Sequence, residues 1–295
     1  MPGTVRTPDD FLSRVPDFPF KPKYRKYAGL RLAHIDEGKG PPVVFIHGEP
    51  TWSFLWRKVI PPIRDAGFRC IAPDLAGFGR SDKPTDIDWY TYDAHFASVA
   101  ALVEELDLRD ATVVVHDWGG PIGLRVAVER CADRIARIVV LDTGLFTGHE
   151  PMTDAWMRFR AFVERTEDLP TGLLVRRACF SDPGDEVIAG YDAPFPNAAS
   201  KAGARAFPLI LPLSPEMPGA DAARRVLDAL REDSRAKLFL WADSDPVIPL
   251  ETGRRFAAAL GREIDHVIAG ASHFLQEDAG PEIGSLIADW LSSGP

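Results

Sequence analysis

Short apolar runs alternate with longer amphipathic segments along most of the chain, and this alternation predicts the fold class. Runs rich in β-branched residues and bounded by turn residues predict five buried strands, at 43–46, 70–72, 113–115, 138–141 and 238–241. Between and after these runs, apolar residues recur at helical spacing near 93–106, 120–130, 251–260 and 281–291. Alternating strands and helices predict an α/β fold, in which helices flank a mostly parallel sheet.

The alternation stops between residues 146 and 218, where strand-like runs disappear and prolines become frequent. Helical patterns occur within this segment at 154–165 and 173–180, and the regular alternation resumes near residue 222. We therefore predict one core domain formed by residues 1–145 and 219–295, with residues 146–218 inserted as a mostly helical cap. Such an insertion would lie at the mouth of the sheet, where it could close a pocket.

Composition and charge narrow the function classes. The 295-residue chain is 45% hydrophobic and 26% charged, which is the profile of an ordinary globular protein. The net charge is −9 and basic pairs are scattered, so we expect no nucleic-acid partner. The N-terminus lacks an apolar signal segment and no apolar run reaches ~18 residues, so we expect no membrane partner. Three cysteines without CxxC spacing predict no zinc or other metal site and fit a cytoplasmic location.

Candidate chemistry begins at residues 113–120, where a predicted strand runs into a predicted helix. Asp117 is followed closely by Gly119 and Gly120, and small residues there permit the sharp strand-to-helix turn of a nucleophile elbow. The usual G-x-S-x-G elbow has Ser at its centre and Gly two residues earlier, whereas this chain has Asp117 and Val115. The alternative interpretation is that Asp117 only caps the N-terminus of the following helix.

Two further segments favour a catalytic role for Asp117. The turn at 47–50 follows a predicted strand at the point where hydrolase folds supply a backbone N–H to an oxyanion hole. His273 lies late in the chain, and the order Asp117, Asp245, His273 matches nucleophile, acid and base in α/β-hydrolases. The acid has two main candidates, because Asp245 and Asp142 each follow a predicted strand. We favour Asp245 and keep Asp142 as the alternative.

Several motifs together resemble those of the haloalkane dehalogenases, over nearly the whole length of the chain. These motifs are HGEPTWSFLWR at 47–57, DLAGFGRSDKPT at 74–85, HDWGG at 116–120, YDAPFPN at 191–197, KAGARAFP at 201–208 and SHFLQED at 272–278. The chain is most similar to the subgroup with an HGEP turn and a catalytic acid late in the chain. The resemblance implies an α/β-hydrolase fold with a helical cap. It also implies hydrolysis of haloalkanes to alcohol and halide without a cofactor.

The implied chemistry explains why a carboxylate stands where esterases have serine. Serine attacking an sp³ carbon would form an ether, whereas Asp117 forms an ester that water can open. The resemblance implies that Asp117 is the nucleophile, that His273 activates water, and that the Trp118 indole N–H binds the halide. The backbone N–H groups of Glu49 and Trp118 would hold the oxyanion. The expected partners are a small apolar halogenated substrate and water, and the oligomeric state stays open.

The second halide donor is the point at which the chain departs from this family pattern. Members with HGEP usually have a second Trp in the cap, and here that position holds Phe159, which has no N–H. Trp156 lies three residues earlier on about the same helix face and is the alternative donor. The other subgroup has Asn in place of Glu49, so that donor is absent too. Losing one donor would slow dehalogenation by ~10²-fold or more.

Two other functions compete with a dehalogenase. The first alternative is an epoxide hydrolase or another Asp-nucleophile α/β-hydrolase with weak dehalogenase activity. Epoxide hydrolases use the same Asp-His-acid set, but that family protonates the opening ring with two cap tyrosines. The predicted cap contains only Tyr191. A non-catalytic binding protein with an α/β-hydrolase fold is the second alternative. The presence of Asp117, His273 and a candidate acid argues against it.

Overall fold

The computed structural model describes residues 3–12 and 15–294, and an eight-stranded sheet lies at its centre. The predicted core domain also includes residues 1–2, 13–14 and 295, which lie outside the described residues. Along the sheet the strands follow the order β10-β9-β8-β7-β4-β5-β3-β2. Neighbours from β5 to β10 are parallel, whereas β3 is antiparallel to β5 and β2 is antiparallel to β3. The predicted α/β class is confirmed.

The strand bounds agree with the sequence pattern where the strands are fully buried. The eight strands are β2 (Lys23–Tyr27), β3 (Leu30–Glu37), β4 (Pro42–Ile46), β5 (Arg69–Pro73), β7 (Ala111–His116), β8 (Ile135–Leu141), β9 (Ala236–Ala242) and β10 (His266–Ile268). Every residue of β7 is buried, as is typical of a central parallel strand with helices on both faces. A separate two-stranded sheet pairs β1 (Thr4–Val5) with β6 (Lys83–Pro84).

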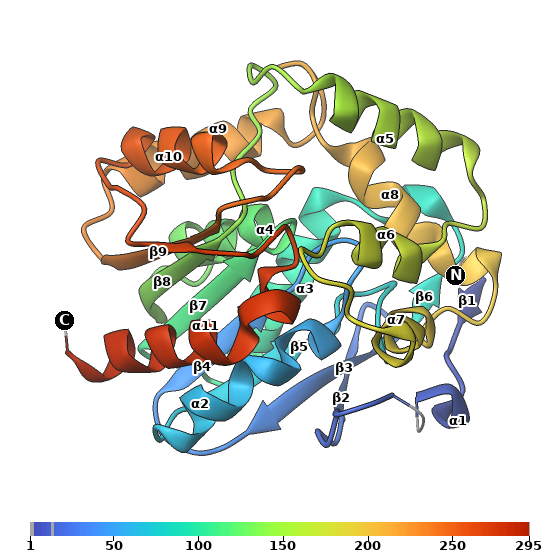
Figure 1. Cartoon of the computed structure of the whole chain (residues 1–295), viewed down its shortest axis with the longest axis horizontal. Helices are drawn as coiled ribbons and strands as arrows, with labels where there is room; N and C mark the ends of the chain where they lie inside the picture. Colours follow the sequence, from blue (N-terminus) through green and yellow to red (C-terminus); the bar gives the residue numbers. More distant parts are fainter. Residues whose placement is uncertain (1–2, 13–14, 295) are drawn as a thin grey trace.

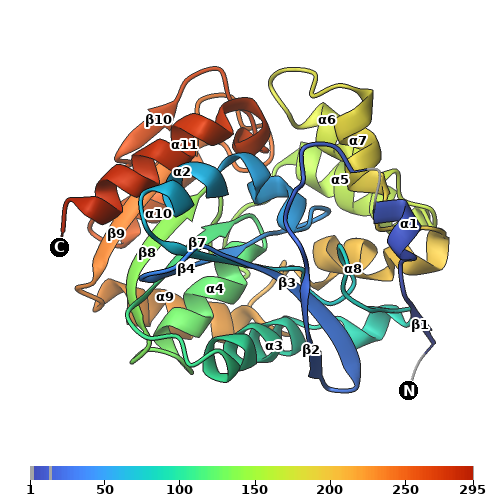
Figure 2. The same ribbon diagram turned by 90° about the horizontal axis from the view of Figure 1, so that it is seen from below.

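Helices cover both faces of the large sheet. Helices α2 (Ile60–Asp65) and α11 (Leu275–Ser292) pack together on one face, and α3 (Tyr92–Glu105), α4 (Gly119–Val128) and α9 (Ala220–Arg231) lie on the other (Figure 2). Helix α10 (Leu250–Ala259) packs against β9. The remaining short helices of this part are α1 (Asp9–Leu12), η1 (Ser53–Lys58) and η2 (Ile87–Trp89). The four helices predicted for the core correspond to α3, α4, α10 and α11.

The segment between β8 and α9 is helical and contains no strand among its described residues. It holds α5 (Asp154–Arg165), α6 (Thr171–Arg177), α7 (Asp185–Asp192), η3 (Ala198–Lys201) and α8 (Ala202–Ile210). Helices α5 and α6 correspond to the two predicted helices, whereas α7 and α8 were not predicted. Figure 1 shows α5 to α8 grouped together on one side of the molecule, away from α9 and α10.

The part of this segment around α7 is tied to the rest of the protein by buried hydrogen bonds. The Trp52 indole N–H donates to the Gly190 carbonyl oxygen at 3.2 Å, and the Tyr191 hydroxyl donates to Glu277 at 2.5 Å. Glu277 also accepts a two-pronged hydrogen bond from Arg57, and both of these side chains are almost completely buried. These contacts join α7 to η1 and α11 through groups that would be costly to leave unpaired.

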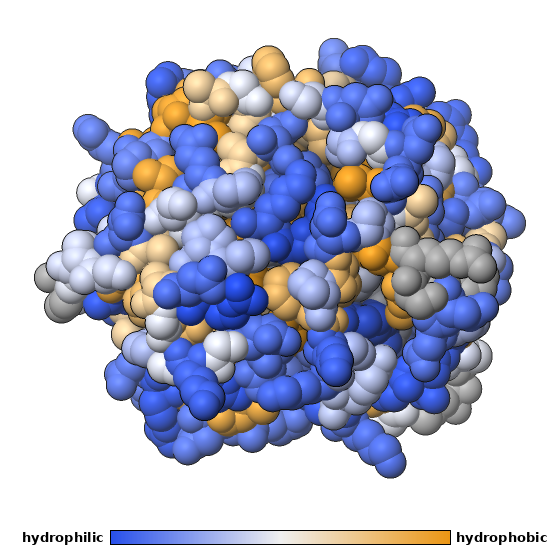
Figure 3. Space-filling model, turned by 60° about the horizontal axis from the view of Figure 1, so that its bottom comes forward, coloured by the Kyte–Doolittle hydropathy of each residue, from blue (hydrophilic) through white to orange (hydrophobic). Residues whose placement is uncertain are grey.

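Most of the surface drawn in Figure 3 is hydrophilic, and its apolar residues occur in separate, smaller areas. Among residues 3–12 and 15–294, no helix is both long enough and apolar enough to cross a bilayer.

Candidate active site

Asp117 occupies a sharp turn between β7 and α4, with a backbone φ of +50°. Gly119 and Gly120 permit this turn, because a Cβ on Gly119 would lie 2.0 Å from the Ile46 carbonyl oxygen and one on Gly120 1.8 Å from Thr143 Oγ1. The Thr143 hydroxyl donates to the Asp117 carbonyl oxygen at 2.6 Å. The N-cap residue of α4 is Trp118, without a side-chain hydrogen bond, so the helix-cap interpretation of Asp117 is wrong.

The turn after β4 holds one oxygen of the Asp117 carboxylate. The Glu49 backbone N–H donates to Asp117 Oδ1 at 2.7 Å, and the Trp118 backbone N–H is a second donor to this carboxylate. Buried His47 fixes the turn, because its Nε2 accepts the Leu75 N–H at 3.0 Å, which leaves Nδ1 to donate to the Gly48 carbonyl oxygen. A tetrahedral intermediate at Asp117 would therefore form its oxyanion between two backbone N–H groups that are already in position.

His273 lies between two carboxylates. Its Nε2 is 3.5 Å from Asp117 Oδ2, and its Nδ1 is 2.8 Å from Asp245 Oδ2. The other oxygen of Asp245 accepts the backbone N–H groups of Val247 at 2.6 Å and Ile248 at 2.9 Å, which fixes the orientation of the carboxylate. The structure thus brings Asp117, His273 and Asp245 together in one row, and His273 hydrogen-bonds to Asp245 rather than to Asp142.

The charges in this row stabilise one another. Burial alone would lower the pKa of His273, but the negative charge of Asp245 and the hydrogen bonds to Asp117 and Asp245 raise it well above its usual value. Burial alone would raise the pKa of Asp117, and the contact with His273 lowers it instead. The pKa of Asp245 is lowered for the same reason. His273 and the two carboxylates thus favour one another's charged forms.

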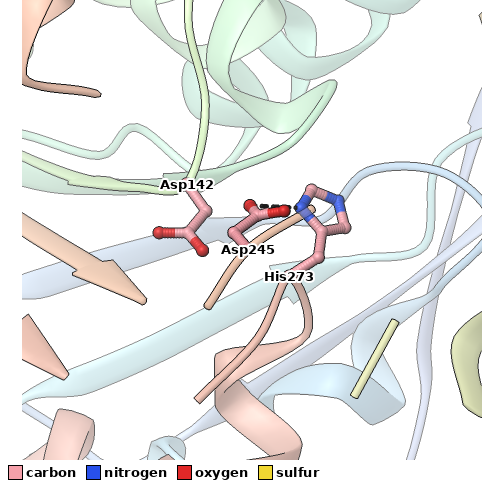
Figure 4. Close-up of side chains that lie close together, drawn as sticks. All are labelled: Asp142, Asp245 and His273. Carbon is pink, nitrogen blue, oxygen red and sulfur yellow. Dashed lines mark hydrogen bonds and ion pairs between the residues drawn. The ribbon is translucent and has the colours of Figure 1, made fainter. Parts of the chain in front are cut away.

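Asp142 lies beside this row, at the end of β8 (Figure 4). Three residues, Asp142, Asp245 and His273, each have one possible metal-ligand atom within 4.8 Å of those of the other two. They are the one candidate metal-binding group among the described residues. However, His273 Nδ1 and Asp245 Oδ2 are already paired with each other at 2.8 Å. The close approach of Asp142 to Asp245 was not predicted.

A cavity of about 840 Å³ opens over the row, and most of its lining side chains are apolar. Asp117, Trp118 and His273 line it from the core, and both Trp156 and Phe159 line it from α5. The ring of Trp118 stacks on Phe207 with a centroid distance of 4.9 Å. The volume of the cavity is in the range that proteins use for small organic ligands.

Two tryptophan N–H groups of this cavity are without a partner. Within the described part of the chain, the indole nitrogens of Trp118 and Trp156 have no hydrogen-bond acceptor, and neither is sealed away as a fully buried atom. In contrast, the Trp241 indole N–H donates to the Ile248 carbonyl oxygen at 3.0 Å. Both of these tryptophans line the cavity, whereas Phe159 adds only an apolar ring.

The side chain of Glu49 is a functional candidate that the sequence did not reveal. It is buried and lines the same cavity, and its Oε1 has no hydrogen-bond partner among the described residues. Burial, together with the negative charge of Asp117, raises the pKa of this carboxyl group well above its usual value. Glu49 therefore brings a buried carboxyl group, in addition to its backbone N–H, into the site.

Tyr191, the single tyrosine of the predicted cap, is fully buried and is not among the described residues that line the cavity. Its hydroxyl is engaged with Glu277. The ring-protonating tyrosines of an epoxide hydrolase thus have no counterpart among the cavity's described lining residues.

Comparisons with known proteins agree with this geometry. A family model for the alpha/beta hydrolase fold matches residues 41–170. The haloalkane dehalogenase of Mycobacterium marinum is 44% identical over 97% of this chain and 99% of the relative. The haloalkane dehalogenase of Psychrobacter cryohalolentis is 35% identical over 99% of each chain. The solved structure of haloalkane dehalogenase DpaA from Paraglaciecola agarilytica matches with a TM-score of 0.89 at 34% identity, over 99% of each chain. The chain therefore belongs to the haloalkane dehalogenase family.

Proposed function

We propose that the protein hydrolyses haloalkanes to an alcohol, a halide ion and a proton through an ester on Asp117. The observation that carries this proposal is the position of Asp117 at a nucleophile elbow, in contact with His273, below an apolar cavity lined by Trp118 and Trp156. An apolar cavity suits a haloalkane, and a carboxylate is the nucleophile that an sp³ carbon requires if the product is to be hydrolysed.

In the first step, Asp117 Oδ2 attacks the carbon that bears the halogen. The Glu49 N–H already holds Oδ1, so Oδ2 is the freer nucleophile. The new C–O bond forms as the carbon–halogen bond breaks, and the electron pair leaves with the halide. We assign the indole N–H of Trp118 as one halide donor and that of Trp156 as the second, in the role that the family usually gives to the position of Phe159.

In the second step, a water molecule attacks the carboxyl carbon of the ester while His273 accepts a proton from it. The oxyanion develops on Oδ1 and is held by the backbone N–H groups of Glu49 and Trp118. The intermediate then collapses by breaking the bond between the carboxyl carbon and Oδ2. Oδ2 leaves with the alkyl group and takes the proton of the newly added hydroxyl, which gives the alcohol and restores the Asp117 carboxylate. Asp245 holds the His273 tautomer and stabilises the imidazolium.

The charge of Asp117 controls the timing of the two steps. The hydrogen bond and negative charge of Asp117 contribute to the raised pKa of His273 in the resting enzyme. Ester formation removes this negative charge, so the pKa of His273 falls and the ring can release its proton. His273 thereby becomes a general base only after the covalent intermediate exists.

We further propose that residues 146–218 act as a cap over this cavity. Trp156 and Phe159 on α5 and Leu174 on α6 line it opposite the catalytic row, which supports that role. The three unpaired cysteines of the chain, Cys70, Cys131 and Cys179, suit a reducing compartment, and we propose a cytoplasmic location.

Trapping the intermediate tests the mechanism. The variant His273→Gln should still be alkylated by a bromoalkane but should fail to hydrolyse the ester, so mass spectrometry should find the alkyl group on the peptide that bears Asp117. The matched control Asp117→Ala should be folded, inactive and unmodified. Alkylation of neither the wild type nor His273→Gln, with the bromoalkane shown to bind, would refute the covalent route. Faster turnover of an epoxide panel than of bromoalkanes would favour the epoxide hydrolase alternative.

A further inference from the structure

Asp142 is a second buried carboxyl group beside the catalytic row, and the mechanism above gives it no task. Its side chain is completely buried at the end of β8, and its backbone φ is +31°. Positive φ is uncommon for a residue other than glycine. The chain therefore keeps a carboxyl group in an apolar interior, next to the negative charge of Asp245, in a backbone conformation that most side chains avoid.

The hydrogen bonds of Asp142 and Asp245 indicate which of the two carboxyl groups can donate a proton to the other. Asp142 Oδ1 accepts the Ala242 backbone N–H at 2.9 Å, whereas Oδ2 is buried and meets no donor among the described residues. Asp245 accepts three N–H groups, from His273, Val247 and Ile248. A carboxylate offers about four acceptor positions, so one position on Asp245 stays open. Figure 4 shows the two carboxyl groups side by side, and one oxygen of Asp142 lies within 4.8 Å of one oxygen of Asp245.

We propose that Asp142 carries a proton and acts as a positioning residue, whose Oδ2–H donates to the open position of the Asp245 carboxylate. This hydrogen bond would occupy the fourth acceptor position of the Asp245 carboxylate and hold that carboxylate against His273. Two adjacent buried carboxylates cannot both be ionised cheaply, so one of the pair keeps its proton.

The charges around the pair decide which carboxyl group keeps the proton. Burial and the negative charge of Asp245 raise the pKa of Asp142 well above its usual value. The pKa of Asp245 is lowered, because the attraction of His273 and the N–H groups of Ile248 and Val247 outweigh its burial. Asp245 and His273 are the charged groups that face Asp142, and His273 pairs directly with Asp245 rather than with Asp142. The proton therefore belongs to Asp142.

The proposal distinguishes two substitutions of Asp142. Asp142→Asn keeps the arrangement, because the introduced amide oxygen can accept the Ala242 N–H while its NH₂ group donates to Asp245. Asp142→Ala removes the donor. We expect the asparagine variant to hydrolyse the ester at nearly the wild-type rate, and the alanine variant to do so about 10-fold to 100-fold more slowly, as for the loss of a hydrogen bond to a charged group. The alkylation step should be unchanged in both.

The proton itself can be detected in the resting protein, so this test does not depend on the proposed reaction. Infrared spectra of protein labelled with ¹³C at the aspartate side-chain carboxyl should contain a protonated-carboxyl band at neutral pH that shifts with the label. The band should be absent from Asp142→Asn, whereas a band from Glu49 would not shift. A wild-type spectrum without such a band would overturn the proposal, as would ester hydrolysis as slow in Asp142→Asn as in Asp142→Ala. A failure of haloalkane turnover alone would instead count against the proposed function.

Discussion

Replacing Asp245 with asparagine should slow ester hydrolysis far more than it slows ester formation. The backbone N–H groups of Val247 and Ile248 donate to Asp245 Oδ1, so in the variant they would hold the introduced amide oxygen and turn its NH₂ group toward His273 Nδ1. His273 would then have to carry its proton on Nε2, which is the nitrogen that must accept a proton from water. The substitution therefore removes a charge and also favours the wrong tautomer.

The size of the effect follows from the distance between the two groups. With Nδ1 and Oδ2 2.8 Å apart, the centres of charge of the imidazolium and the carboxylate are about 4 Å apart. At an effective dielectric constant of about 20, their attraction is about 4 kcal/mol. Losing that attraction in the transition state of water attack corresponds to about a 10³-fold slower step. Alkylation does not require His273 to act as a base and should change by less than about 10-fold.

Rapid-quench mass spectrometry can separate the two steps, since the alkylated Asp117 peptide differs in mass from the free one. With a bromoalkane, the asparagine variant should show a burst of alkylated enzyme near one equivalent, followed by slow decay. The matched control is Asp142→Asn, which should accumulate little adduct. Fast decay in Asp245→Asn combined with slow decay in Asp142→Asn would refute the reasoning and would move the catalytic acid to β8.

Three further outcomes are expected. Trp156→Phe should cut chloride release by ~10²-fold, as the loss of a charge-stabilising donor does, and Phe159→Trp in the wild-type background should add little. Because His273 must be neutral to act as a base and Asp245 still raises its pKa after the charge of Asp117 is lost, adduct accumulation in the wild type should increase as the pH falls from about 9 to about 5. Arg57→Met should lower the free energy of unfolding in urea by about 3 kcal/mol, because it leaves buried Glu277 with only the half-exposed Lys58 as a cationic partner.

These outcomes have matched controls. Arg224→Met breaks an exposed ion pair with Asp221 and should change stability by less than about 1 kcal/mol. Equal losses in Arg57→Met and Arg224→Met would contradict the importance of the buried pair. A gain in chloride release from Phe159→Trp, with no loss in Trp156→Phe, would transfer the second donor role to position 159. Adduct accumulation that does not depend on pH would contradict the assignment of His273 as the base.

The core could be predicted from the sequence because each of its central strands is buried on both faces. Strand β7 appears as an uninterrupted apolar run for that reason. The edge strand Lys23–Tyr27 escaped prediction, because exposed and partly buried positions alternate along it without an apolar face. Helix α2 was also missed, since its sequence IPPIRD contains two prolines that are tolerated only in a first turn.

The role of Asp117 could be predicted because the local sequence contains both the carboxylate and the strand-to-helix turn that positions it. Spacing alone did not decide between Trp156 and Phe159, because both positions of α5 line the cavity. The contact of Asp142 with Asp245 joins residues about a hundred positions apart, and it depends on β8 and β9 being neighbours in the sheet. Strand order of this kind is not encoded in local periodicity.

The presence of a carboxyl group after β8 and another after β9 also affects how the catalytic acid could move from one strand to the other within this family. A chain with one acid must pass through an inactive sequence if it loses that acid before gaining another. This chain already carries both, so a single change at Asp245 would leave Asp142 within 4.8 Å of the histidine. Removing the charge of Asp245 would also lower the pKa of Asp142. A second carboxyl group would therefore stay close to the base during such a change, even though the loss of Asp245 itself slows ester hydrolysis.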